Sequence, residues 1–123
     1  MKFELKGHNY LVLLSLDENL CLSSVLNEVL HGFRVPEFDQ TIGLSRQEAL
    51  DLHKKLSESR PEGRRVEITL RQLVGLRHAL AESLEELGVE EFHTRVGMPF
   101  QEGKQLGIQI DRAIQSASAP PSN

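Results

Sequence analysis

The chain has 123 residues with 14 Lys and Arg against 18 Asp and Glu, and its formal net charge of −4 does not favour nonspecific attraction to nucleic acid or to an anionic membrane. This length suits one compact domain, and the 5% aromatic content without Trp argues against a base-stacking platform. Cys21 is the only cysteine, which excludes an internal disulfide and favours a reducing compartment.

The first predicted element is a β-hairpin. Residues 2–6 alternate between polar and apolar side chains, residues 10–14 are largely apolar, and Gly7 between them is typical of a turn. Charged residues interrupt the apolar ones near the N-terminus, so we expect neither a signal peptide nor a membrane span. We therefore place the protein in the cytoplasm.

Three helices are predicted after this hairpin. Ser15 and Glu18 fit a capping box, in which the two side chains accept hydrogen bonds from backbone amides of the first helical turn. Phe38 and Ile42 stand four residues apart in a short helical turn that a glycine stops. A further helix begins at Ser45, which opens another capping box.

The second half of the chain follows the same order of elements. A strand is predicted at 65–70, then a helix capped by Thr69 and Gln72, a short helical turn that ends at Gly97, and a last helix. A shift of 54 residues aligns the two halves, and 13 of the 45 aligned positions are identical, where chance gives about three. The sequence therefore predicts two repeats, 10–56 and 64–110.

These elements indicate a helix-rich α+β fold. We expect an internal duplication of a strand-helix-short helix-helix unit around a small antiparallel sheet, in which the strands near 10–15 and 65–70 pair and the helices cover one face. Residues 1–115 are predicted to form one compact domain. Residues 116–123 consist of small and polar residues with Pro, and we expect a disordered tail there.

Residues 38–56 have the sequence outline of a helix-turn-helix, and the basic residues that follow them suggest a wing. A DNA-binding regulator of this helix-turn-helix-like or winged-helix-like kind is one hypothesis, although Glu48 and Asp51 on the second helix would repel phosphates. The residues that would contact DNA or another partner are Arg46, Gln47, Lys54, Lys55, Arg60, Arg64 and Arg65.

Catalysis is not expected from this sequence. Carboxylates recur at equivalent positions of the repeats, including Glu28 and Glu82, but a role in helix capping or on a solvated face explains them better than a metal or acid–base site. His31 lacks the second motif that a di-iron bundle needs. We expect neither a metal nor a cofactor.

Gly103 and Gly107 stand four residues apart in the last predicted helix, where each glycine costs about 1 kcal/mol relative to alanine. Close approach of another helix would compensate for this cost, either inside the fold or across a homodimer. Fraying of the last helix is the alternative explanation.

The residues Leu26-Asn27-Glu28-Val29 with Gly32, followed by Glu37-Phe38 and Gly43, resemble a family of small uncharacterised bacterial proteins. In that family a leucine-rich helix precedes a Glu-Phe and glycine box. The resemblance covers 22–56 and implies a soluble bacterial protein without a catalytic role. This chain departs from the family because its usual Thr-Arg pair is present only as Thr94-Arg95 in the second repeat.

The hypothesis that we prefer is a small cytosolic protein-interaction module of the adaptor or immunity-protein kind. Negative charge, capped helices and the lack of a catalytic motif favour it. The sequence does not identify the partner. Self-association through the last helix or through an exposed strand edge is a further hypothesis.

Overall fold

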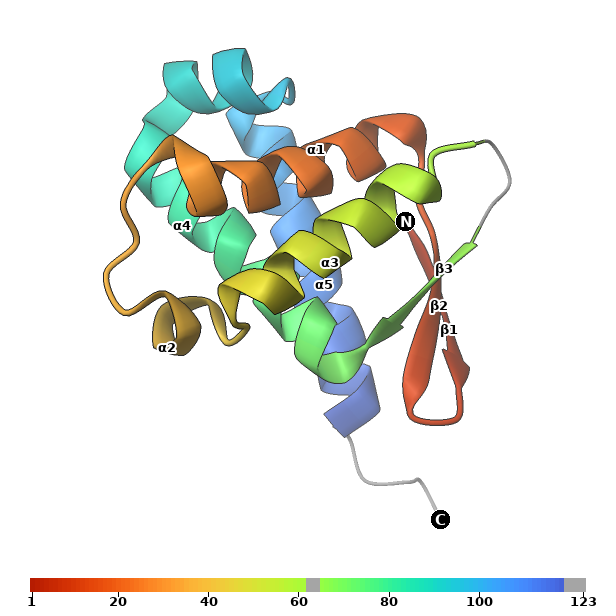
Figure 1. Ribbon diagram of the computed structural model, residues 1–123. Coiled ribbons are helices and arrows are strands. Elements are labelled where there is room, and N and C mark those ends of the chain that lie inside the picture. Colours follow the sequence, from red (N-terminus) through yellow and green to blue (C-terminus); the bar gives the residue numbers. More distant parts are fainter. Residues whose placement is uncertain (62–64, 119–123) are drawn as a thin grey trace.

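The computed structural model describes residues 1–61 and 65–118, which form a helix-rich α+β fold, as the sequence predicts. The helices lie together on one side of a small antiparallel sheet (Figure 1). In chain order the elements are β1 (Lys2–Lys6), β2 (Asn9–Leu13), α1 (Leu16–Asn27), a π-helical turn η1 (Glu28–Gly32), α2 (Phe38–Ile42), α3 (Arg46–Glu58), β3 (Arg65–Thr69), α4 (Leu70–Val96) and α5 (Phe100–Ser118).

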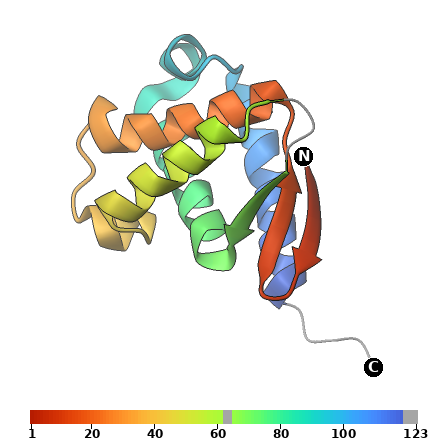
Figure 2. The same cartoon turned by 45° about the vertical axis from the view of Figure 1, so that its right-hand side comes forward.

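The sheet has the strand order β1-β2-β3, and its neighbouring strands are antiparallel. The predicted hairpin joins β1 to β2 through Gly7, whose φ of 62° is a conformation that glycine adopts without strain. The predicted pairing of β2 with β3 is confirmed, and its register places Val12 opposite Val66. Both valines are buried on the inner face of the sheet, along which α5 runs (Figure 2).

The helix starts follow the predicted local chemistry. Ser15, Ser45 and Thr69 each cap a helix, and each is part of a complete capping box. Gly43 and Gly97 end the helices α2 and α4 with nearly the same left-handed backbone geometry, φ 85° in both. In each half a strand leads into a capped helix, and a left-handed glycine precedes the last helix, while the duplication itself stays a sequence prediction.

Two predicted boundaries differ from the structure. The long helix and the short helical turn of the second half form one element, α4, which bends at Gly88 because the φ of 72° and ψ of −175° there are not helical. Helix α5 runs to Ser118, so residues 116–118 are helical and not part of a tail. Residues 119–123 of the predicted tail lie outside the described residues.

Buried Asn19 ties α1 to the end of α3. Its amide donates to the carbonyl oxygen of Leu56 at 2.9 Å and to the Ser59 hydroxyl at 3.1 Å. A buried amide needs such partners, because an unsatisfied polar group costs roughly 1–3 kcal/mol. The contact fixes the angle between two helices that pack against each other and against the rest of the core.

Helices α4 and α5 pack closely through the two glycines of α5. Gly103 and Gly107 are both buried, and a Cβ atom added to them would lie 2.7 Å from Phe92 Cε1 and 2.9 Å from Arg77 Nη1, respectively. The close helix approach is therefore inside the chain.

Within the described residues, no helix combines the length and apolar character that spanning a membrane requires.

Candidate functional site

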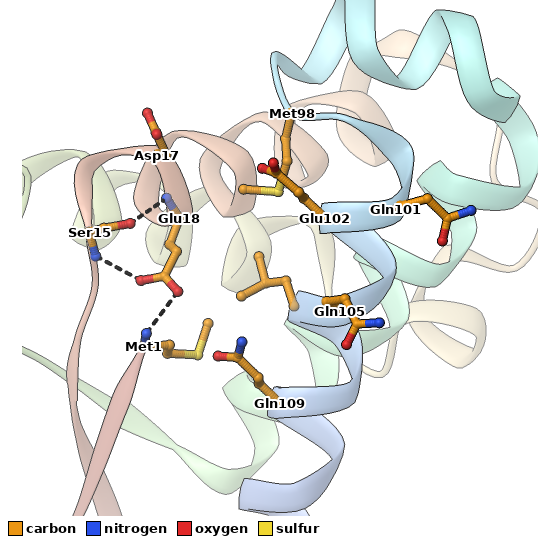
Figure 3. Close-up of a pocket in the computed structure, with 10 residues that line it drawn as sticks. Met1, Ser15, Asp17, Glu18, Met98, Gln101, Glu102, Gln105 and Gln109 are labelled. Atoms are coloured by element: carbon orange, nitrogen blue, oxygen red, sulfur yellow. Dashed lines mark hydrogen bonds and ion pairs between the residues drawn. The ribbon is translucent and has the colours of Figure 1, made fainter.

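A groove runs along α5, between this helix on one side and Met1, β1 and the start of α1 on the other. Its first part lies between α1 and α5 and has a volume of about 520 Å³ (Figure 3). Its second part lies between β1 and α5 and has a volume of about 730 Å³. Met1 and Gln109 line both parts, so we treat them as one feature, the α5 groove.

One wall of the α5 groove is held by Glu18. Its Oε1 accepts from the Ser15 amide at 2.8 Å, which completes the capping box of α1. Its Oε2 accepts from the ammonium group of Met1, also at 2.8 Å. A single carboxylate therefore joins the beginning of the chain to the first turn of α1, as Figure 3 shows.

The other wall is a row of polar residues on α5. They follow one another at steps of three, four and three residues, so they lie on one face of the helix, within about 80° of its circumference. Below them, Met98 and Leu106 are buried and also line the groove. We call this row the α5 polar stripe: Glu102, Gln105, Gln109 and Arg112.

The strand β1 places apolar side chains in the second part of the groove. The register pairs Leu5 with Tyr10, so both side chains lie on the inner face of the sheet. Tyr10 is only 2% exposed and donates to the carbonyl oxygen of Ala113, whereas Leu5 is 60% exposed. The sheet face that packs on the core at β2 is therefore exposed to solvent at Leu5 of the edge strand β1.

The charges of the groove separate along its length. Asp17 and Glu102 lie at the end near the start of α1, and Arg112 lies at the end near β1. Among the described residues, these three side chains make no ion pair. The α5 groove therefore offers carboxylates at one end, amides and apolar groups in the middle, and a guanidinium at the other end.

Cys21 is a residue of α1, and its side chain is buried in the core. Burial, and to a lesser extent the negative charge of Glu18, raise the pKa of its thiol to about 12. The thiol therefore stays protonated at neutral pH, and a protonated thiol is a poor nucleophile and a poor metal ligand. Within residues 1–61 and 65–118, no group of three or more His, Cys, Asp and Glu side chains is arranged to hold a metal ion.

The structure gives the predicted contact residues at the start of α3 partners within the chain. The guanidinium of Arg46 donates to the carbonyl oxygen of Leu30 at 3.1 Å, and its Cζ lies 4.5 Å from the ring centroid of Phe38. Gln47 donates to Asp51 at 2.9 Å. Arg46 therefore fastens α3 to η1 and α2, a role that the sequence pattern did not indicate.

The remaining basic residues of this set are distributed over α3, the turn after it and β3. Lys55 donates to the carbonyl oxygen of Glu67 at 2.9 Å, and Arg65 pairs with Glu4 at 2.7 Å. Arg64 lies outside the described residues. Lys54 lies 4.0 Å from Glu58, and Arg60 donates to Asn19 at 3.3 Å. These intramolecular contacts add no support to the DNA-binding hypothesis.

The recurring carboxylates do not gather at one place. Glu28 is buried in η1, where its two oxygens accept from Arg95 at 3.1 and 2.6 Å. Glu48, which is partly exposed, forms a similar two-bond pair with Arg71, and these hydrogen bonds, with that from the Ser45 amide, lower the pKa of its carboxyl to about 2. Both pairs join the two halves of the chain, so these carboxylates stabilise the fold.

Sequence reasoning missed the α5 polar stripe, although its three- and four-residue spacing is visible in the sequence. The Glu-Phe and glycine box, on which the family resemblance rests, contributes core and helix-end residues in α2: Phe38 is buried and Gly43 ends the helix. No protein-family model, curated protein or solved structure matches this chain.

Proposed function

We propose that this protein is a protein-interaction module that binds a polypeptide segment in the α5 groove. The observation that carries this proposal is Leu5, which is 60% exposed on the sheet face that elsewhere forms the core. Its neighbours in the groove include Phe3, Gln109 and Arg112. An apolar patch bordered by polar groups that can form hydrogen bonds is typical of a surface that a partner covers.

The chemistry of the groove suits a polypeptide. Each glutamine side chain offers a carbonyl acceptor and two amide donors, the same kinds of group that a peptide backbone presents. The strand β1 is the edge of the sheet next to the groove, and an edge strand has unpaired backbone groups to which an extended segment can add. Gln109 stands on the wall opposite β1, and an extended segment between them would meet hydrogen-bonding groups on both sides.

The length of the groove also suits a short segment. The polar stripe runs from Glu102 to Arg112, ten helical steps that span about 15 Å. About five residues of extended chain, or about ten of helix, cover this distance. A surface of this size accommodates one apolar anchor next to Leu5 with polar contacts around it, the arrangement in which a few central residues supply most of the binding energy.

Site-specific photo-crosslinking tests the proposal. A photoreactive amino acid replaces Leu5 in one variant and Val89 in a matched control, since Val89 is 63% exposed in α4 and lines none of the described parts of the groove. We expect a discrete protein adduct, identified by mass spectrometry, only from position 5. Adding Gln109→Lys to that variant should reduce the adduct. Equal adducts from both positions, or none from position 5, would overturn the proposal.

A further inference from the structure

The α5 polar stripe has opposite charges at equal distances on either side of its midpoint, Gly107. Glu102 stands five residues before Gly107 and Arg112 five residues after it, and Gln105 and Gln109 stand two residues to either side. Glu102 and Arg112 are separated by about 15 Å along the helix, too far for an ion pair within one chain. Both are exposed, and neither has an ion-pair partner among the residues that the structure describes.

A second α5 that runs in the opposite direction matches this stripe. With a twofold axis at the level of Gly107, Glu102 of one copy faces Arg112 of the second copy, and Gln105 faces Gln109. Twofold symmetry forms each of these contacts twice. A parallel arrangement would instead place Glu102 opposite Glu102, where the like charges repel each other.

Exposed apolar side chains border the stripe on both sides. Ile108 is 40% exposed on α5, one residue from the level of the axis, and Leu5 borders the groove from β1. In a pair of copies these apolar side chains would be removed from water beside the polar contacts, and charged groups toward the rim are usual in a protein interface. Gly107 itself faces Arg77 within the chain, so the contact surface is the outer face of α5.

We propose that the polypeptide segment bound in the α5 groove is α5 of a second copy of this chain, antiparallel to the first. This inference rests on the proposed function and specifies its partner. The two copies form a closed pair, in which each polar stripe covers the other and the apolar side chains of β1 are removed from water. The pairing depends on charge, so it weakens as salt screens the ion pairs.

Charge reversal tests the arrangement. Analytical ultracentrifugation over a range of concentrations at low salt gives the dimer dissociation constant of the full chain. Glu102→Arg alone and Arg112→Glu alone should each raise this constant about tenfold or more, because each replaces two ion pairs by two repulsions. The double variant Glu102→Arg/Arg112→Glu should return it to within about threefold of the original, since both pairs form again with reversed signs.

A matched control separates local pairing from net charge. Glu90→Arg reverses an exposed carboxylate of α4 that lines no described part of the groove, and it should leave the dissociation constant unchanged. Circular dichroism confirms that each variant keeps the helical fold. Restoration in the double variant supports direct contact between Glu102 and Arg112 of different copies.

Two outcomes would overturn this inference. They are a monomer up to millimolar concentration, and a dimer whose dissociation constant neither single reversal changes. If the chain is monomeric and the crosslinker at position 5 still captures a different protein, the interaction-module proposal stands and only the second copy is excluded. If that crosslinker yields no adduct of any kind, both proposals fail.

Discussion

The same substitution at two glycines of α5 is expected to have opposite effects on stability. In Gly103→Ala the new Cβ would lie 2.7 and 2.8 Å from two ring carbons of Phe92 and 3.3 Å from Leu84 Cδ2. Phe92 is fully buried, so its ring can shift only by displacing other core side chains. In Gly107→Ala the near atoms belong to the guanidinium of Arg77, 2.9 Å away at the closest. That side chain is partly exposed and can shift toward solvent.

The magnitudes follow from these contacts. Alanine is favoured over glycine in a helix interior by about 1 kcal/mol at both positions. Overpacking against a rigid core costs about 1–3 kcal/mol, so Gly103→Ala should lower the free energy of unfolding by up to about 2 kcal/mol. At position 107 the only loss is the ion pair between Arg77 and Asp111, worth at most about 1 kcal/mol, so Gly107→Ala should leave stability unchanged or raise it by up to about 1 kcal/mol.

Urea denaturation followed by circular dichroism measures both variants. The expected separation between them is about 2 kcal/mol, which corresponds to about 6–10 °C in Tm for a domain of this size. In an Arg77→Ala background, Gly107→Ala should give the full helix-propensity gain of about 1 kcal/mol. Equal destabilisation by the two substitutions, or a stabilising Gly103→Ala, would refute the packing of α4 against α5 described above.

Three further predictions concern the interior and its ionisable groups. Arg95→Ala should lower the free energy of unfolding by about 3 kcal/mol because it leaves Glu28 buried without a counter-charge, and adding Glu28→Gln should recover part of the loss, as urea denaturation will show. Ser83→Ala should leave stability unchanged or raise it by up to about 1 kcal/mol, because the buried Ser83 Oγ has no partner among the described residues; a clear loss of Tm would reveal a hydrogen bond there. Burial, and then the charges of Arg60 and His31, lower the pKa of His53 below its ordinary 6.5. Its contribution to stability is therefore complete above pH 6.5 and is lost as the pH falls through the lower pKa of the folded state, so His53→Gln should flatten the dependence of Tm on pH between about 7 and 5.

The parts of the fold that depend on neighbouring residues could be predicted from the sequence. The capping boxes at Ser15, Ser45 and Thr69 each involve two residues three apart, so the pattern contains the whole interaction. Gly7 marks the hairpin and Gly43 a helix end for the same reason. The bend in α4 could not be placed in this way. Only Gly88 departs from helical backbone angles, and the sequence does not show whether the helix continues after it.

The parts that depend on distant residues could not be predicted. Glu28 and Arg95 are 67 residues apart, and only the packing of η1 against the end of α4 brings them together. The basic side chain at Arg46 looked free in the sequence because its partners, a backbone carbonyl and a ring face, leave no charge signal. The exposure of Leu5 depends on how far α5 covers the sheet, which no periodicity in β1 reveals.

The contact between Lys55 and Glu67 limits how copies of this chain can add to one another. A sheet with two open edges can accept a strand on each side and so can grow into a chain of molecules without end. Here the Lys55 ammonium donates a hydrogen bond to the backbone carbonyl oxygen of Glu67 in β3. A strand that pairs with this carbonyl would have to displace the lysine. The edge at β1 has no such lysine contact among the described residues. A strand would therefore add less readily at β3 than at β1, and unequal edges work against repeated addition of copies through the sheet.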